Sequence, residues 1–134
     1  GHRTITGDAK HIASEDDSFD AVVSLCAIEH FGLGRYGDEF DIEADARAVK
    51  EFIRVLRPGG ILLFSTTIKR GHPVLLFNAH RIYNREMIHD LCDGLVAIRE
   101  IYYSRETNQI CSIEEIPQST DTWHLYCDLW EKQQ

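Results

Sequence analysis

The fold is decided by residues 20–66, which open with Asp20-Ala21-Val22-Val23-Ser24-Leu25-Cys26 and close with Ile61-Leu62-Leu63-Phe64-Ser65-Thr66. Both runs are short and nearly continuous in apolar residues, a pattern typical of strands buried on both faces of a parallel sheet. Between them, residues 42–56 repeat apolar side chains at helical spacing, with acidic residues in the first turn and arginines in the last. Pro58-Gly59-Gly60 is expected to stop this helix. The order strand, helix, strand predicts a βαβ unit with a right-handed crossover.

The rest of the chain extends this sheet. Asn84 is a candidate N-cap for a helix over residues 85–93, which Gly94 would end. Residues 95–104 and 122–130 alternate as strands, and no helix separates them, so an antiparallel pair is expected. The fold class is therefore α/β, with a mixed sheet that is parallel except at its C-terminal end. On the second of these strands, the alternation predicts one face formed by Trp123, Leu125, Cys127 and Leu129. The aromatic residues expected to pack on this pair of strands are Tyr102, Tyr103, Trp123 and Trp130.

Composition narrows the class of protein. A chain of 134 residues is long enough for one domain, and its net charge of −8 disfavours nucleic acid and anionic lipid as partners. No apolar run approaches the roughly 20 residues that span a bilayer, and no leader opens the chain, so we expect a cytoplasmic protein without a membrane partner. Gly1-His2 resembles a tag remnant. The four cysteines form no C-x-x-C pair and the histidines show no zinc-ligand spacing, so no metal site is expected.

Three motifs occur in order: Gly7-Asp8-Ala9, Ser18-Phe19-Asp20-Ala21-Val22-Val23 and Leu56-Arg57-Pro58-Gly59-Gly60. Together they resemble the class I S-adenosylmethionine-dependent methyltransferases of the small-molecule type, in which these motifs follow the third strand, open the fourth and precede the fifth. Residues 34–38 and 77–83 are similar to a little-characterised branch of methyltransferase-like proteins. The resemblance implies a Rossmann-like sheet and S-adenosylmethionine as cofactor.

The same resemblance implies that a part of the domain is missing. The family's glycine-rich cofactor loop and its ribose-binding acidic residue belong to the first two strands, and nothing before Arg3 can supply them. Residues 1–134 are then a single partial domain that begins at the third strand and lacks the first βαβ half. Residues 21–25 would form an exposed apolar edge, which predicts a homo-oligomer formed by pairing or swapping at that edge.

Candidate cofactor contacts follow from the resemblance. Asp8 is similar to the residue that accepts a hydrogen bond from the adenine amine, and Ala9 would offer its backbone N–H to a ring nitrogen. The alternative is that Gly7-Asp8 forms a turn without a functional role. Cys26 and Ala27 follow the fourth strand and would pass under the cofactor.

Two candidate catalytic residues, Glu29 and His30, come directly after that strand, where open α/β sheets bind their ligands. Histidine has a pKa suited to a general base for a substrate hydroxyl or amine. The alternative is that both are solvated loop residues.

Residues 32–37 match the pattern G-x-G-x-x-G, but the helix begins several residues later and after acidic residues that would repel phosphate. We therefore interpret this stretch as a loop beside the cleft, with Arg35, Tyr36 and Asp38 available to a polar substrate. After the fifth strand, Asn78, His80, Arg81 and Tyr83 either build a substrate pocket, or cap the next helix and anchor a loop, with Arg81 paired to an acidic neighbour.

Two functions remain open. The first is methyl transfer from S-adenosylmethionine to a small polar molecule, with weak or no activity for this chain alone. The second is a non-catalytic methyltransferase-like domain that serves as an oligomerisation or regulatory subunit. A nicotinamide-binding domain is a distant third possibility.

Overall fold

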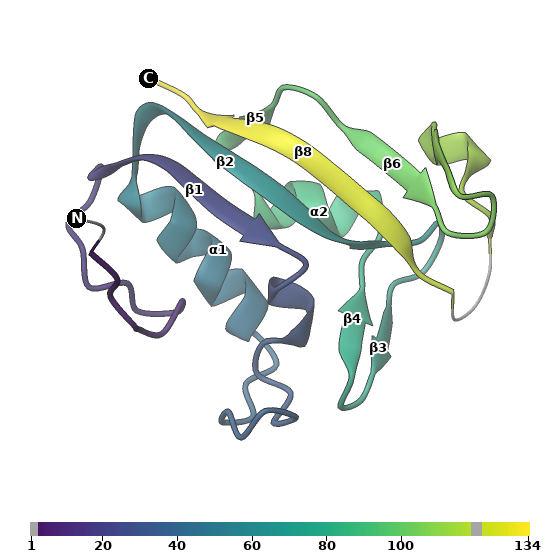
Figure 1. The fold of residues 1–134 in the computed structure, drawn as a ribbon, viewed down its shortest axis with the longest axis horizontal. Helices are drawn as coiled ribbons and strands as arrows, with labels where there is room; N and C mark the ends of the chain where they lie inside the picture. Colours follow the sequence, from purple (N-terminus) through teal and green to yellow (C-terminus); the bar gives the residue numbers. More distant parts are fainter. Residues whose placement is uncertain (1–2, 119–121) are drawn as a thin grey trace.

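The computed structural model describes residues 3–118 and 122–134 and contains a mixed six-stranded sheet (Figure 1). Strand β1 (Phe19–Leu25) runs parallel to β2 (Leu56–Ile68), and α1 (Ala44–Val55) connects them. This confirms the predicted strand, helix and strand. The helix begins at Ala44 rather than at residue 42, because the chain before it is held in a turn by Asp41, whose Oδ1 accepts a hydrogen bond from the Glu43 N–H at 3.0 Å.

The Pro58-Gly59-Gly60 stretch does not separate the helix from the strand as predicted. It lies inside β2, which already begins at Leu56, where the backbone turns from helical to extended. The pairing with β1 shifts in register over this stretch, from Phe19 opposite Leu56 to Ala21 opposite Ile61. The motif is therefore an irregularity at the start of the strand.

The antiparallel part of the sheet is built around β8 (His124–Lys132), which lies between β2 and β6 (Ile101–Ser104). Strands β5 (Leu95–Ala97) and β7 (Gln109–Cys111) complete the sheet, β5 on β8 and β7 on β6. The predicted antiparallel pairing is confirmed, but the single strand predicted over residues 95–104 is two strands. The parallel part is smaller than predicted: β5 and β6 run in the same direction as β2, but β8 separates them from it.

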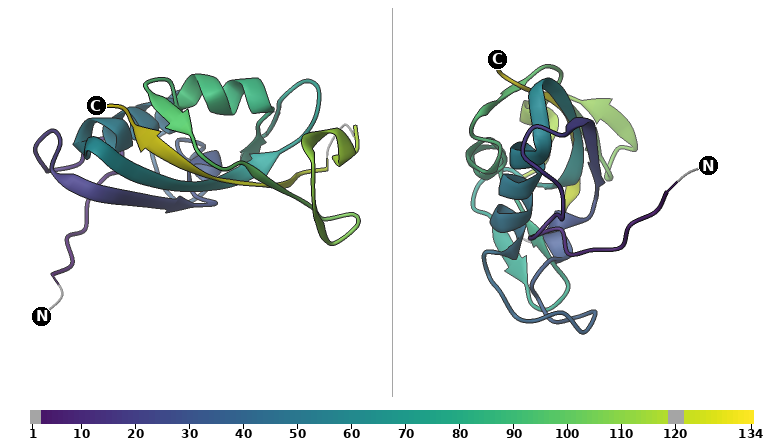
Figure 2. Two further views of the ribbon diagram at one scale, coloured as in Figure 1. Left: turned by 90° about the horizontal axis from the view of Figure 1, so that it is seen from above. Right: turned by 90° about the vertical axis from the view of Figure 1, so that its left-hand side faces the viewer.

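Both α-helices pack on one face of the sheet. Figure 2 shows α1 and α2 (Arg85–Leu91) on the same side of the strands. The helix α2 begins at the predicted cap, where Asn84 Oδ1 accepts a hydrogen bond from the Met87 N–H at 2.9 Å. The core between the helices and the sheet includes Val49, Phe52, Leu62, Phe64, Ile88, Tyr126 and Trp130.

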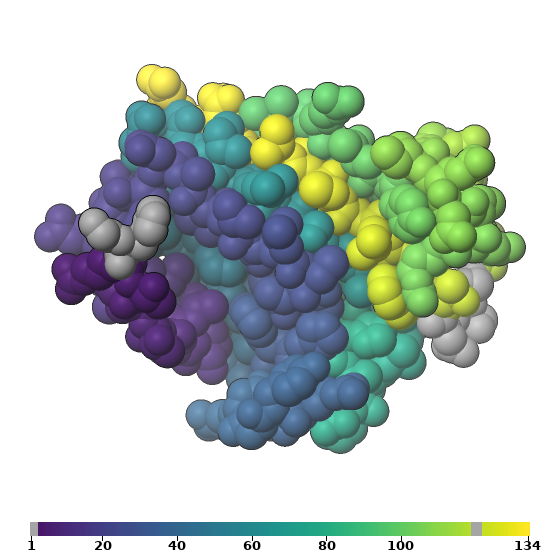
Figure 3. All heavy atoms as spheres, viewed as in Figure 1, coloured from purple at the N-terminus to yellow at the C-terminus, as the bar shows by residue number. Residues whose placement is uncertain are grey.

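No α-helix of residues 3–118 and 122–134 covers the opposite face of the sheet, and Figure 3 shows β1, β2 and β8 at its surface. Val23 is 61% exposed and Leu25 is 56% exposed, so the burial of β1 on both faces that its apolar run predicts is wrong for this chain. On β8 the buried face is His124, Tyr126, Asp128 and Trp130. The face predicted from Leu125, Cys127 and Leu129 is the open one, and Leu129 is 38% exposed.

A two-stranded hairpin, β3 (Val74–Leu76) and β4 (His80–Ile82), projects beyond the end of β2. Short 3-10 turns lie at η1 (Ile28–His30) and η2 (Ile113–Glu115). The hairpin returns the chain to the sheet through a bridge between Ile68 and Tyr83. Among the helices of the described residues, none has both the length and the apolar character needed to cross a membrane.

Candidate functional site

A cavity of about 680 Å³ lies beyond the carboxyl end of β1. Cys26, with a φ of 46°, ends the strand, and its backbone N–H donates to the Ser65 carbonyl oxygen on β2 at 2.9 Å. The chain then turns through η1, whose last residue, His30, lines the cavity. The N-terminal segment, the loop after η1 and the first residue of α1 complete the wall. The lining residues are Gly7, Asp8, Ala9, Lys10, Ala27, His30, Phe31, Gly32, Tyr36, Asp38, Glu39 and Ala44.

His30 is held in one orientation by the hairpin. Its Nδ1 lies 2.8 Å from the carbonyl oxygen of Ala79. A carbonyl oxygen only accepts, so Nδ1 carries the proton and Nε2 of the neutral ring keeps its lone pair. The ring also makes edge contacts with Tyr36 and His80, at centroid distances of 6.1 and 5.9 Å. This geometry leaves Nε2 able to accept a proton.

Glu29, the other predicted catalytic residue, does not line the cavity. Its side chain is buried, and Oε2 accepts a hydrogen bond from the Thr66 hydroxyl at 3.0 Å. Burial raises the pKa of Glu29 above its ordinary value, although its hydrogen bonds act in the opposite direction. The two residues therefore differ in their surroundings: His30 lines the cavity, whereas Glu29 is buried against Thr66 of β2.

Asp8 and Ala9 lie on the wall opposite η1, in a tight turn closed by the hydrogen bond from the His11 N–H to the Asp8 carbonyl oxygen. Asp8 Oδ1 accepts from the Lys10 N–H at 2.9 Å. The other oxygen, Oδ2, lies 4.0 Å from the Lys10 ammonium, and because the Asp8 side chain is 54% exposed it can still accept a further donor. In the part of the chain that the structure describes, the Ala9 N–H meets no acceptor. This turn therefore offers one acceptor and one donor side by side.

The loop after η1 is closed by Gly32 and Asp38. With a φ of 71°, Gly32 sits where an added Cβ would lie 2.0 Å from the Asp41 carbonyl oxygen, so no other residue fits. Asp38 Oδ2 accepts from the Gly32 N–H at 2.8 Å. Partial desolvation would raise the pKa of Asp38, but the surrounding backbone N–H groups lower it, and the carboxylate stays charged. Tyr36 lines the cavity, whereas Arg35 lies outside its wall, 5.9 Å from the Tyr36 ring centre.

The hairpin residues divide between surface and core. Asn78 is exposed at the hairpin tip and His80 is partly buried against His30, and neither lines the cavity. Burial lowers the pKa of His80, and the nearby charges of His30, Arg35 and Arg105 lower it further.

Arg81 is buried, and its guanidinium donates to the carbonyl oxygens of Phe31 and Ile42 at 2.6 and 2.9 Å. The geometry therefore favours the anchoring role for Arg81, because its side chain joins the hairpin to both ends of the cavity loop.

The expected acidic partner of Arg81 is Asp45, a residue that sequence reasoning did not identify. Asp45 lies on the buried face of α1, where its Oδ2 accepts from the Tyr83 hydroxyl at 2.7 Å and lies 3.4 Å from Arg81 Nε. The signal was a carboxylate at a core-facing position of an apolar helix pattern, which calls for a buried partner. The described residues contain no group of three or more potential ligands that could hold a metal ion.

Comparison with solved structures places this architecture in the Rossmann-like methyltransferase fold. The [4+2]-cyclase SpnF matches 95% of this chain and 55% of its own length, at 18% identity and a TM-score of 0.66. A SAM-dependent methyltransferase from Thermotoga maritima matches 96% of this chain and 63% of its own, at 18% identity and a TM-score of 0.59. The Burkholderia thailandensis 1,6-didemethyltoxoflavin-N1-methyltransferase, with bound S-adenosylhomocysteine, matches 94% and 48%, at 11% identity and a TM-score of 0.61.

These identities are low, so the likeness shows the fold, and the chain spans about half to two thirds of the length of these three structures. No curated protein matches the sequence. One family model matches residues 5–124, and it is described as "Caenorhabditis protein of unknown function, DUF268". The chain belongs to this DUF268 family.

Proposed function

We propose that this chain is part of an S-adenosylmethionine-dependent methyltransferase that acts on a small polar molecule. One observation carries the proposal: a single cavity at the carboxyl end of β1 collects Asp8, Ala9, Ala27, His30 and Tyr36, five residues predicted for cofactor, catalysis and substrate. The methyltransferase fold supports it, because ligands of open α/β sheets bind at this edge.

His30 is the proposed general base. His30 lines the cavity, and its Nε2, which has no hydrogen-bond partner among the described residues, can accept the proton of a substrate hydroxyl or amine as that group is methylated. The Ala79 carbonyl oxygen, bonded to Nδ1, then stabilises the imidazolium that forms. The cofactor supplies an activated methyl group when bound. Contacts of Arg35, Tyr36, Asn78 and His80 with substrate remain predictions.

The turn at Asp8 and Ala9 fits the adenine end of the cofactor. The exposed Asp8 oxygen can accept from the exocyclic amine, and the Ala9 N–H can donate to a ring nitrogen. The glycine-rich loop and ribose carboxylate that the resemblance implies have no counterpart in this sequence. Each lost hydrogen bond to a charged group weakens binding by about 1.5–3 kcal/mol. This chain alone should therefore bind the cofactor weakly.

Calorimetric titration with S-adenosylhomocysteine tests the proposal. The expected result is weak, saturable binding that Asp8→Ala reduces and that Asp93→Ala leaves unchanged. Asp93 is a suitable control because it is exposed and its side chain makes no hydrogen bond among the described residues. Binding that both substitutions leave unchanged would remove Asp8 from the site. Complete absence of binding would favour the second function below.

The second candidate is a non-catalytic methyltransferase-like domain that associates through its sheet. The uncovered apolar face and the free edge of β1 favour it, since exposed edge strands pair with other chains. The fold itself is compatible with other roles, because SpnF is named as a cyclase. We expect light scattering to detect a homo-oligomer that Val23→Lys dissociates. Ile110→Lys, on the opposite edge strand, should not change the mass. A monomer at high concentration would contradict this association.

A further inference from the structure

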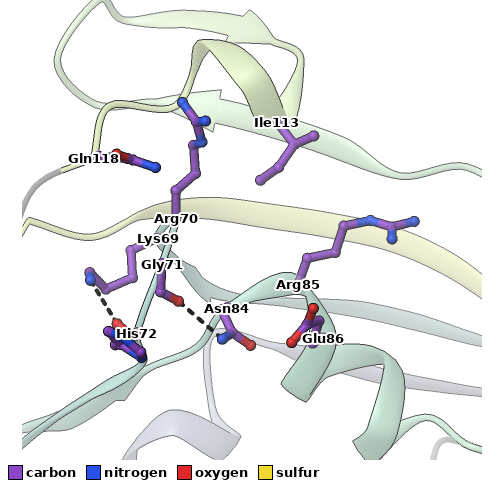
Figure 4. Close-up of a pocket in the computed structure, with 9 residues that line it drawn as sticks. All are labelled: Lys69, Arg70, Gly71, His72, Asn84, Arg85, Glu86, Ile113 and Gln118. Carbon is purple, nitrogen blue, oxygen red and sulfur yellow. Dashed lines mark hydrogen bonds between the residues drawn. The ribbon is translucent and has the colours of Figure 1, made fainter.

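Cationic side chains gather in two places at the edge of the sheet where β2 ends. The first is a hollow of about 370 Å³ next to that end, lined in part by Lys69, Arg70 and Arg85. In Figure 4 the charged ends of these three side chains point to different sides, so the hollow does not bring them together on one ligand. The second place surrounds His80 of the hairpin, beside the proposed general base His30.

A row of aromatic rings leads from His30 across the hairpin to the start of β8. The His30 and His80 ring centres lie 5.9 Å apart and those of His80 and Trp123 lie 6.1 Å apart, with interplanar angles of 74° and 78°. Trp123 directly precedes β8, whose first residue pairs with Ile68 at the end of β2. The row therefore follows the same edge of the sheet as the cavity, where ligands of open α/β sheets bind.

Arg105 lies on the last ring of this row. It follows Ser104, the last residue of β6, and its backbone N–H donates to His124 Nδ1 at 3.1 Å. Its guanidinium carbon lies 3.7 Å from the centre of the Trp123 ring, close enough for stacking. The residue is exposed, and its side-chain N–H groups meet no acceptor among the described residues. The stack therefore supports the guanidinium and leaves its donors available to a ligand.

The surroundings of His80 are positively charged. Its Nε2 is buried and has no hydrogen-bond partner in the described part of the chain. Burial lowers the pKa of His80, and the three charges that lower it further are those of His30, Arg35 and Arg105. Arg35 also lies beside a ring, with its guanidinium carbon 5.9 Å from the centre of Tyr36. Within residues 3–118 and 122–134 neither arginine forms an ion pair, so this positive charge is uncompensated in a chain with a net charge of −8.

An acidic group is the ligand chemistry that this arrangement favours. A guanidinium fork matches the oxygens of a carboxylate or a phosphate, and stacking on Trp123 reduces the entropy lost when the side chain binds. A cationic ligand would be repelled by the same charges. We propose that the substrate carries a carboxylate or phosphate group that Arg105 binds on the Trp123 ring, while the atom to be methylated lies at His30.

This inference rests on the proposed function and adds to it the substrate class and a residue that selects the substrate. His80 and Trp123 lie between His30 and Arg105, so the acidic group and the reacting atom belong to opposite ends of an elongated molecule. Arg105 holds the acid at one end, and His30 remains the general base at the other.

Nuclear magnetic resonance of the ¹⁵N-labelled chain tests this substrate class with three probes of similar skeleton. The first, para-hydroxyphenylpropanoate, carries a hydroxyl and a carboxylate at opposite ends. The second, para-hydroxyphenylethylphosphonate, replaces the carboxylate by a phosphonate, and the third, para-hydroxyphenylpropanamide, is neutral. At least one acid should bind saturably and shift the Arg105 Nε–H, the Trp123 indole N–H and the His30 ring nitrogens. The amide should bind about tenfold more weakly, because it lacks the charge.

Each outcome of these titrations has a definite meaning. The acid that binds more tightly identifies the recognised group as a carboxylate or a phosphate. Equal affinities for the acids and the amide, or no saturable binding of either acid, would overturn the inference. Binding at Arg105 that leaves the His30 signals unchanged would contradict a substrate that spans the row. The titrations contain no cofactor, so these failures are distinct from a failure of S-adenosylhomocysteine to bind at Asp8.

Matched charge removals at the two ends of β6 separate a specific site from general attraction. Arg105→Gln should weaken acid binding about tenfold, since it removes a charged hydrogen-bond donor. Arg99→Gln removes the same charge from an exposed side chain before β6. The four residues of β6 separate the two positions by about 13 Å, which exceeds the Debye length of about 8 Å at physiological ionic strength. The control should therefore change the affinity less than about twofold, and equal losses in the two variants would refute the site.

Arg105→Lys tests the stacked guanidinium itself. Lysine keeps the charge but cannot present a planar fork on the Trp123 ring, so acid binding should remain about threefold weaker than in the native chain. Because the Arg105 side chain is exposed and makes no hydrogen bond among the described residues, far-ultraviolet circular dichroism should be unchanged in all three variants. Native affinity in Arg105→Lys would contradict recognition by the guanidinium fork.

Discussion

Replacing Arg81 by methionine should lower the free energy of unfolding by about 3–5 kcal/mol, the loss typical when one partner of a buried ion pair is removed. The Arg81 and Asp45 side chains are 8% and 9% exposed, and Nε lies 3.4 Å from Oδ2. Methionine keeps much of the apolar stem but leaves the Asp45 carboxylate without a cation. The Tyr83 hydroxyl remains as a neutral partner and compensates only in part.

The same substitution removes a charged donor from two loop carbonyls. Phe31 and Ile42 flank the cavity loop, and both carbonyl oxygens accept from the Arg81 guanidinium. These bonds belong to the same buried network, so their loss overlaps with that of the ion pair and is not added to it. Because small domains are stable by only about 5–15 kcal/mol, the change removes a large part of the total.

Urea denaturation followed by circular dichroism measures the effect. Arg57→Met is the matched control: Arg57 pairs with Asp20, but the two side chains are 54% and 83% exposed, and such pairs contribute about 0–1 kcal/mol. In an Asp45→Asn background, Arg81→Met should cost less, because no buried carboxylate is left unpaired. A loss in Arg81→Met no larger than that of the control would refute the reasoning.

Two further substitutions probe the loop and η1. Gly32→Ala should destabilise the chain by about 2 kcal/mol or more, because its Cβ would meet the Asp41 carbonyl oxygen. Gly37→Ala is the control: open space surrounds Gly37, so the substitution should cost only the backbone strain of about 1 kcal/mol. Thermal unfolding compares the two variants, and equal losses of stability would contradict the steric argument. Glu29→Gln should remove a pH dependence of stability. The folded-state pKa of Glu29 is raised, so its stabilisation is complete below the unfolded value near 4.5 and is lost as the pH rises through the folded value, by up to about 1.4 kcal/mol per pH unit. Urea midpoints of both proteins from acid to neutral pH test this, and a difference independent of pH would count against it.

The sequence predicts the parts of the fold that local periodicity encodes. β1, α1 and β2 each carry a continuous pattern, and their order leaves few topologies. The buried face of β8 was misread because polar residues occupy core positions there: His124 and Asp128 are buried and alternate with apolar residues on the open face. Asp128 is accommodated by hydrogen bonds from the Tyr126 hydroxyl and the Arg99 N–H, partners that a strand pattern does not reveal.

The candidate site was predictable where it follows the end of a strand. Ala27 and His30 were placed at the cavity because the chain must leave β1 there. The directions of neighbouring side chains are not predictable from the sequence, because consecutive residues of a 3-10 turn point to different sides. Glu29 instead accepts a hydrogen bond from the buried Thr66 hydroxyl on β2. The sequence favours neither substrate binding nor anchoring for Arg81, since only the tertiary structure shows which carbonyl oxygens it reaches.

The position of β8 has a consequence for how the molecule is made. Strand β8 follows both β2 and β6 in the sequence but lies between them in the sheet, so those two strands cannot join until residues 124–132 have left the ribosome. Until then β2 exposes a long unpaired edge beside apolar side chains, the kind of surface on which nascent chains aggregate. In the folded chain the Lys132 ammonium, at the end of β8, donates to the carbonyl oxygens of Ile53 on α1 and Leu56 on β2, at 2.9 and 2.7 Å. The sheet is therefore completed only after β8 has been synthesised, and a nascent chain that stalls before β8 is the species most in need of a chaperone.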